Sequence, residues 1–235
     1  NHGLRLLLVG SPGTGKTTII KAIAEAYGLP YDVIHLNGAN SALEIKGTDS
    51  SYDGSDAGKL VKSFYQLGIT EAVIGLDEID KMASGGKDGN PADALLDTLS
   101  DEHVCYDAFL ETGIDTHNTV YIATANSTNG IPEFLLNRFK VIMVDDYDDD
   151  DKVVIAQEYV IPQLLKTYDL SKTDIVFPTD VLLYMVKRFC SDNGVRGLKE
   201  GVHSIIRMII NCWDEAGKRT SVVVDSEMVN NRLEP

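Results

Sequence analysis

The fold is decided by the stretch Gly10-Ser11-Pro12-Gly13-Thr14-Gly15-Lys16-Thr17-Thr18. The segment before it, residues 4–9, is apolar without a polar face, which predicts a buried parallel strand. The segment after it, residues 17–27, has apolar residues at helical spacing and stops at Gly28-Leu29-Pro30. A loop of the form Gly-x4-Gly-Lys-Thr between a strand and a helix indicates a phosphate-binding loop.

The residue types of this loop suit the binding of phosphate. Gly13 and Gly15 can adopt the positive φ values that turn successive backbone N–H groups toward phosphate oxygens, and a helix N-terminus adds partial positive charge. We expect Lys16 to reach the β- and γ-phosphates and the Thr17 hydroxyl to hold Mg²⁺. The alternative is a glycine-rich turn before a helix. The predicted nucleotide-binding residues are Pro12, Gly13, Thr14, Gly15, Lys16, Thr17 and Thr18.

Composition narrows the class of protein. The chain has 235 residues, ample for a real core, and a net charge of −15, which argues against a broad footprint on nucleic acid. Its three cysteines, Cys105, Cys190 and Cys212, lack metal-site spacing, so we predict reduced structural thiols in a cytoplasmic protein. The sequence contains neither a signal peptide nor a membrane-length apolar run, and we predict no membrane partner.

Hydrophobic periodicity predicts strands and helices in alternation, then helices. This order predicts a doubly wound parallel α/β domain over residues 1–147 and a small α-helical domain over 148–235, with the boundary near Tyr147. For the acidic stretch 145–151 we favour a solvated linker with an Asp capping the next helix over a metal site. The predicted strands are 4–9, 31–36, 72–80, 119–124, 140–144 and 221–224; the helices are 17–27, 59–67, 91–99, 132–138, 152–166, 179–190 and 197–215; and 37–58 is predicted to be a loop.

Two acidic residues form the second strong signal. Asp77 and Glu78 follow an apolar strand, and the carboxyl ends of parallel strands are where ligands gather in an open sheet. Nucleotide hydrolysis needs a carboxylate near Mg²⁺ and a base that takes a proton from water. We assign Asp77 to the metal and Glu78 to the water. The alternative is a pair of acids that ends a strand at the surface.

With these residues in place, the chain resembles AAA+ ATPases, and more narrowly the ATPase module of Lon proteases. The resemblance extends over nearly the whole chain. It rests on segments in the family order: Gly10 to Thr17, Leu76-Asp77-Glu78-Ile79-Asp80-Lys81-Met82, Ala123-Thr124-Ala125-Asn126-Ser127, Leu135-Leu136-Asn137-Arg138-Phe139 and Gly194-Val195-Arg196-Gly197-Leu198. The resemblance implies the AAA+ fold, a P-loop α/β domain followed by a small helical lid.

The resemblance also assigns roles to three further residues. Asn126 matches the first sensor, Arg138 the finger that reaches a neighbouring subunit's nucleotide, and Arg196 the second sensor. Together with Glu78 they form the implied catalytic set. Judged by spacing alone, Asn126 reads equally as a turn residue and Arg196 equally as an exposed residue at a helix start. For Arg138 a surface salt-bridged arginine is the favoured reading without the resemblance.

In this family Tyr52 would lie in the loop that lines a central pore and grips an unfolded polypeptide. Asp53 departs from the family pattern, which usually has an apolar residue there, and an acid weakens an apolar grip. The alternative for Tyr52 is a loop aromatic packed on its own domain. Residues 82–86 match the second pore loop.

The implied function is binding and hydrolysis of ATP with Mg²⁺, coupled to unfolding and translocation of protein substrates by a homo-hexamer. The resemblance places a Ser-Lys peptidase domain beyond Pro235, and we expect the chain to be a piece of a longer protein. Two alternatives stay open: a nucleotide-gated assembly switch that turns over little, and a DNA-directed Lon-like motor without proteolysis. The acidity of the chain makes a nucleic-acid partner the less favoured reading.

Overall fold

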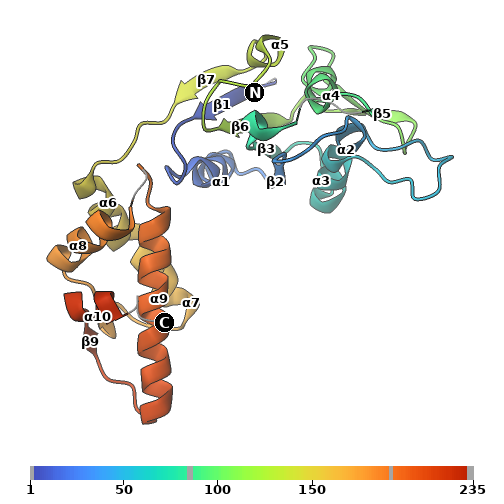
Figure 1. The fold of residues 1–235 in the computed structure, drawn as a ribbon. Helices are drawn as coiled ribbons and strands as arrows, with labels where there is room; N and C mark the ends of the chain where they lie inside the picture. Colours follow the sequence, from blue (N-terminus) through green and yellow to red (C-terminus); the bar gives the residue numbers. More distant parts are fainter. Residues whose placement is uncertain (1–2, 84–86, 191–192, 232–235) are drawn as a thin grey trace. The chain divides into compact units, whose positions relative to one another are not determined.

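The computed structural model describes residues 3–83, 87–190 and 193–231. Contacts between residues divide the chain into two units, one of residues 1–10 and 15–144 and the other of residues 11–14 and 145–235. Each unit has its own buried apolar cluster or clusters. Figure 1 draws both units and labels most of their helices and strands.

The first unit is built on a five-stranded parallel sheet with the order β2-β3-β6-β1-β7. The central strand β6 pairs with β3, with Ala123 opposite Leu76, so both strands reach their carboxyl ends at the same edge. Crossover helices join the strands, as a parallel sheet requires. The strands are β1 (Arg5–Val9), β2 (Tyr31–His35), β3 (Val73–Asp77), β6 (Val120–Ala125) and β7 (Lys140–Met143).

Helices cover both faces of this sheet. On one face α1 (Lys16–Tyr27) buries Ile20 and Ala24 against apolar residues of β1, β3 and β6. On the other face a larger cluster includes residues of α2 (Leu43–Lys46), α3 (Lys59–Leu67), α4 (Pro91–Thr98) and α5 (Glu133–Leu136). The doubly wound α/β domain predicted from the sequence is therefore confirmed.

The first unit also contains elements that the sequence analysis did not predict. A hairpin of β4 (Val104–Asp107) and β5 (Thr112–Asp115) follows α4, and α2 lies within the predicted loop. The predicted strand 72–80 is too long, because Glu78 has a φ of 61° and leaves the extended conformation. A 3₁₀ turn, η1 (Ile79–Lys81), follows instead.

The second unit is mainly helical, as predicted. The predicted helix 152–166 is a continuous helical path of α6 (Asp149–Ile155), a π-helical turn η2 (Ala156–Val160) and α7 (Ile161–Thr167). Pro162 in the first turn of α7 has no N–H for the regular bond to the turn before it, which accounts for the irregular turn. The remaining elements are β8 (Ile175–Val176), α8 (Thr179–Phe189), α9 (Arg196–Ala216), β9 (Val222–Val223) and α10 (Ser226–Asn231).

In the acidic stretch between β7 and this helical path, an Asp caps the next helix, as the sequence predicts. The Asp148 side chain caps α6 by accepting the N–H of Asp151 at 2.7 Å. Tyr147 donates its hydroxyl to the carbonyl of Thr14 at 3.0 Å, which is one reason that residues 11–14 group with this unit. The acidic stretch thus starts a helix by capping it.

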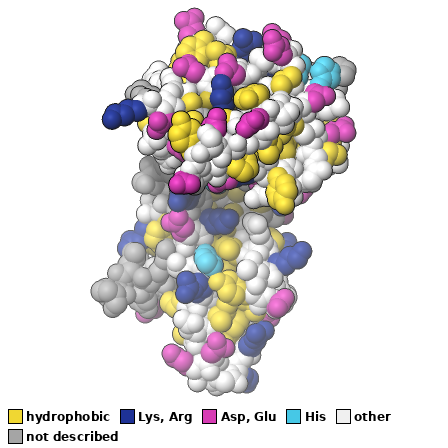
Figure 2. All heavy atoms as spheres, turned by 90° about the vertical axis from the view of Figure 1, so that its right-hand side faces the viewer, with side chains coloured by type: hydrophobic (Ala, Val, Ile, Leu, Met, Phe, Trp, Pro, Cys, Tyr) yellow, Lys and Arg dark blue, Asp and Glu magenta, His cyan; other side chains and the backbone are white. Residues whose placement is uncertain are grey.

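The surface is acidic and mixed in character. On the face drawn in Figure 2, Lys and Arg side chains are scattered among acidic and apolar ones. Within the described residues, no helix is both long and apolar enough to cross a membrane. Cys105 is buried, and burial raises its pKa to about 11. Cys105 is therefore an unreactive core residue.

Candidate active site

The loop between β1 and α1 has the backbone shape that the sequence predicts. Gly13 and Gly15 have φ values of 80° and 82°, in the region that only glycine adopts without strain. Gly15 is the residue that precedes α1, so the loop leads directly into a helix N-terminus. At Gly10 a Cβ atom would lie 2.5 Å from the carbonyl oxygen of Val144, which leaves no room for a side chain.

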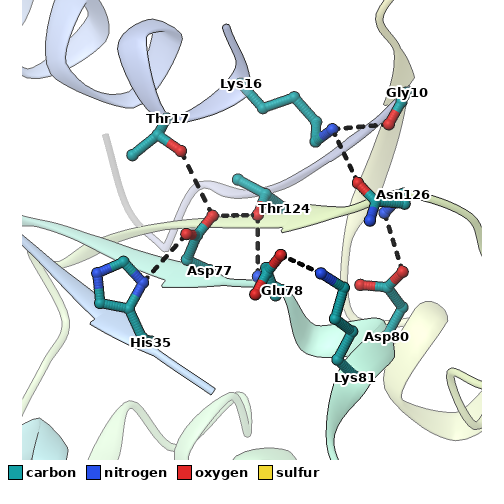
Figure 3. Close-up of polar contacts among 10 residues, drawn as sticks. All are labelled: Gly10, Lys16, Thr17, His35, Asp77, Glu78, Asp80, Lys81, Thr124 and Asn126. Atoms are coloured by element: carbon teal, nitrogen blue, oxygen red, sulfur yellow. Dashed lines mark hydrogen bonds and ion pairs between the residues drawn. The ribbon is translucent and has the colours of Figure 1, made fainter. Parts of the chain in front are cut away.

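Lys16 begins α1 and its ammonium group lies in the site. Its Nζ donates to the carbonyl oxygen of Gly10 at 2.6 Å and to Oδ1 of Asn126 at 3.2 Å (Figure 3). Desolvation lowers the pKa of Lys16, and the negative charges of Asp80, Asp77 and Glu78 partly oppose this shift. A buried, partly desolvated cation is suited to bind the phosphate groups of a nucleotide.

Thr17 and Asp77 present two oxygen ligands of the kind that Mg²⁺ prefers. The Thr17 hydroxyl lies 3.5 Å from Oδ1 of Asp77, and His35 at the end of β2 lies with Nδ1 3.1 Å from Oδ2 of the same carboxylate. Proteins usually hold Mg²⁺ with one or two such oxygens and leave the other positions to phosphate and water. The donor set therefore fits Mg²⁺, with Thr17 and Asp77 as the residues that would hold it.

Glu78 follows Asp77 in a left-handed conformation that costs about 1–2 kcal/mol for a residue with a side chain. Its N–H donates to the hydroxyl of Thr124 at 3.0 Å, and its carboxylate forms an ion pair with Lys81. Strain of this kind concentrates at functional sites, where the surrounding structure holds it. In Figure 3 the Glu78 carboxylate lies against the ammonium group of Lys81.

Asn126 is tied to the site by both its side chain and its backbone. Its Oδ1 accepts from Lys16, and its N–H donates to Oδ2 of Asp80 at 3.0 Å. The other carboxylate oxygen of Asp80 is buried and has no hydrogen-bond partner among the described residues. Of the two readings of Asn126, the geometry favours a residue of the site over an isolated turn residue.

The structure thus brings five predicted residues together from three different elements and their ends: Lys16, Thr17, Asp77, Glu78 and Asn126. It adds four that the sequence analysis did not single out: His35, Asp80, Lys81 and Thr124. Thr124 had a signal in the sequence, because it is the polar member of an otherwise apolar strand. Asp80 and Lys81 had no signal in the sequence beyond their place in the segment that follows Asp77 and Glu78.

The other predicted residues lie elsewhere. Arg138 follows α5 and its Nη1 lies 3.4 Å from Oδ2 of Asp101. Tyr52 is 69% exposed in the loop before α3, so it does not pack on its own domain. Arg196 starts α9 in the second unit and pairs with Glu200 at 3.3 Å. Pro12 and Thr18 are exposed, and part of the predicted second pore loop, residues 84–86, lies outside the described residues.

This fold and site define the class of protein. The family model of the ATPase family associated with various cellular activities (AAA) matches residues 6–147, and the chain belongs to this family of ATPases.

Comparison with curated proteins gives a narrower likeness. The chain is 37% identical over 234 residues to the Lon protease of Rickettsia bellii, covering 99% of this chain and 30% of that protein. It is 36% identical over 217 residues to Lon protease 2 of Desulfotalea psychrophila, covering 92% of this chain and 28% of that protein. It is 35% identical over 234 residues to the Lon protease of Methanosphaera stadtmanae, covering 99% of this chain and 28% of that protein. The predicted resemblance to the AAA+ module of Lon-like proteases is confirmed, and the chain spans less than a third of these relatives.

Proposed function

We propose that this chain binds ATP with Mg²⁺ and hydrolyses it at the carboxyl edge of the parallel sheet. The observation that carries the proposal is the convergence of Lys16, Asn126, Asp77 and Glu78 at the ends of β3 and β6 and the start of α1. A phosphate-binding cation, an oxygen pair suited to Mg²⁺ and a carboxylate base are the parts that phosphoryl transfer to water requires.

Each residue has a distinct part in this proposal. Backbone N–H groups of the loop and the ammonium of Lys16 bind the phosphates, and Thr17 and Asp77 would hold Mg²⁺. Bound Mg²⁺ supplies positive charge that offsets the charge developing on the phosphate oxygens. The Asn126 amide orients the attacking water or the γ-phosphate, and Glu78 takes the proton from that water.

Lys81 forms an ion pair with the proposed base, Glu78. Its ammonium pairs with the Glu78 carboxylate in the described structure, and the two residues lie one turn apart across η1. The pair restricts the position of the Glu78 side chain. We include Lys81 in the proposed site as a partner of the base.

The proposal extends to the longer protein that the relatives represent. The curated relatives are named Lon proteases, and Tyr52 is strongly exposed on a loop of the first unit. We propose that ATP hydrolysis drives unfolding and translocation of protein substrates through a six-subunit ring, with Arg138 reaching a neighbour's nucleotide and Arg196 acting as the second sensor. The residues 1–147 and 148–235 would be the large and the small domain of this module.

Replacing Glu78 by Gln tests the proposal. The amide keeps the shape of the carboxylate and cannot take a proton, so ATP turnover should fall by about 10²- to 10⁴-fold while MgATP still binds. ATP hydrolysis and fluorescent-nucleotide binding are measured on the same preparations. The matched control is Glu71→Gln, the same change at an exposed position just before β3, which should hydrolyse ATP at the parent rate.

Two results would contradict the proposal. Turnover of Glu78→Gln at the parent rate would remove Glu78 as the base. A parent protein that binds MgATP and does not hydrolyse it at any concentration would instead favour the nucleotide-gated assembly switch.

A further inference from the structure

Thr124 forms hydrogen bonds with both acidic residues of the proposed site, Asp77 and Glu78. It lies near the end of β6, which pairs with β1 on one side and β3 on the other, and its side chain is 1% exposed. Its hydroxyl donates to Oδ1 of Asp77 at 2.5 Å and accepts the N–H of Glu78 at 3.0 Å. One side chain therefore links both acidic residues of the proposed site (Figure 3).

The Thr124 hydroxyl donates one of these two hydrogen bonds and accepts the other. A threonine hydroxyl has one proton to donate and two lone pairs that accept. The proton is committed to the Asp77 carboxylate, which leaves a lone pair for the Glu78 N–H. The first bond turns Oδ1 of Asp77 to a defined position beside the Thr17 hydroxyl, 3.5 Å away. The second bond holds the backbone of Glu78 where φ is 61°.

Packing alone does not call for a hydroxyl at this position. Side chains alternate along a strand, so Thr124 continues the row of Val120 and Ile122, both buried in the apolar cluster beneath α1. A valine would continue that row with almost the same shape. A buried hydroxyl costs stability unless it is hydrogen-bonded, and here its two partners are both residues of the site.

We propose that Thr124 is a positioning residue for ATP hydrolysis. It sets the Asp77 carboxylate for Mg²⁺ and holds Glu78 in the strained backbone conformation that aims its carboxylate toward the water. Its hydroxyl acts through these two neighbours rather than by binding nucleotide or water itself. This inference rests on the proposed function and adds a residue to it.

The decisive comparison is Thr124→Val against Thr124→Ser. Valine keeps the shape and removes the hydroxyl, so turnover should fall by about 10- to 100-fold, the range found when the partner of a metal ligand is removed. Serine keeps the hydroxyl and should stay within about threefold of the parent rate. ATP affinity in EDTA should be unchanged in both, since Thr124 does not touch the phosphates. The tightening of ATP binding on addition of Mg²⁺ should be smaller only in the valine variant.

Thr119→Val is the matched control. Thr119 is a fully buried threonine just before β6 whose hydroxyl donates to the carbonyl oxygen of Thr70 at 2.7 Å, away from the site. This variant loses a comparable hydrogen bond, so it measures the general effect of removing a buried hydroxyl. Its turnover and its Mg²⁺ response should match those of the parent.

The inference is overturned if Thr124→Val matches Thr119→Val in both turnover and Mg²⁺ response, or if Thr124→Ser falls as far as Thr124→Val. If Thr124→Val fails to fold, Thr124→Ser and Thr124→Ala make the same test, because both leave a smaller side chain and only serine keeps the hydroxyl. Failure of the proposed function has a different signature. The parent itself would then lack ATP turnover, and the Mg²⁺ response of nucleotide binding would still report on Thr124.

Discussion

The burial of Lys16 in the proposed site destabilises the folded chain. The side chain is nearly buried, and desolvation lowers its pKa from 10.5 even though Asp80, Asp77 and Glu78 oppose the shift. The charged form is therefore less favourable in the folded chain than in the unfolded chain. A bound ligand of opposite charge would compensate for this unfavourable desolvation of the ammonium group.

Replacing Lys16 by Met should separate the two effects. Nucleotide binding should weaken by at least about 100-fold, because a charge-assisted contact with phosphate is lost. The free energy of unfolding without nucleotide should not decrease, because a desolvated charge is removed. Isothermal binding of ATP and urea unfolding measure the two quantities.

The difference in the free energy of unfolding between the parent and Lys16→Met should depend on pH in a defined direction. The folded-state pKa of Lys16 lies below 10.5, so the unfolded chain binds the proton more tightly and the residue destabilises the fold at neutral pH. The penalty shrinks as the pH rises toward 10.5, and the variant and the parent should converge there. Lys21→Met, on the exposed side of the same helix, is the control and should keep ATP binding. A Lys16→Met protein with unchanged affinity would disprove the role of the loop.

The β4–β5 hairpin anchors the loop that carries Tyr52. Asp107 at the end of β4 is fully buried and accepts three N–H groups, those of Gly58 at 2.8 Å and of Phe109 and Leu110 at 3.0 Å. Gly58 is the residue before α3, and a Cβ on Gly47 at the other end of the loop would lie 2.9 Å from its nitrogen. The loop 48–57 therefore projects from a narrow base fixed by one carboxylate.

Replacing Asp107 by Ala should destabilise the first unit. Three N–H groups lose their acceptor, and we expect the free energy of unfolding to fall by about 2–4 kcal/mol. Urea unfolding followed by circular dichroism measures the change. Asp115→Ala is the control, since Asp115 is exposed and accepts only the N–H of His117 among the described contacts, and it should cost no more than about 0.5 kcal/mol. Equal losses in the two variants would contradict this account of the loop base.

The proposed ring assembly would explain why Arg138 lies apart from Glu78 and Lys16, the proposed base and the proposed phosphate-binding residue. In the described structure its ion pair is with Asp101, which also pairs with Arg5 at 3.2 Å. An exposed pair of this kind contributes little to stability. Arg138 can leave it at small cost when a neighbouring copy presents a nucleotide.

If Arg138 acts in a neighbouring subunit, specific ATPase activity should rise with protein concentration. Arg138→Ala should abolish this rise and lower the plateau by about 10³-fold, the scale of an arginine that stabilises transferring phosphate. The measurement is ATP turnover over a concentration series with mass determination by light scattering. Arg188→Ala, an exposed arginine on α8, should behave as the parent. A concentration-independent rate that is the same in parent and Arg138→Ala would rule out action between subunits.

The sequence predicted most of the first unit and named five of the side chains that the structure brings together. The α3 helix, the glycine conformations of the loop and the parallel α/β architecture are all confirmed. These features are local, because helix and strand periodicity, glycine positions and the loop motif each lie within a few residues of one another. The order of motifs along the chain then identified the family.

Only the tertiary structure decided which side chains support the site. Thr124 and Asp77 are 47 positions apart, and Asn126 and Asp80 are 46 apart, so their contacts depend on β3 and β6 being neighbours. The hairpin and its Asp107 anchor depend in the same way on pairing and burial between distant segments. Sequence by itself determined the conformations and residue types that short-range physics controls. The long-range partners of Asp77, Glu78 and Asn126 were set by strand pairing, which no local pattern encodes.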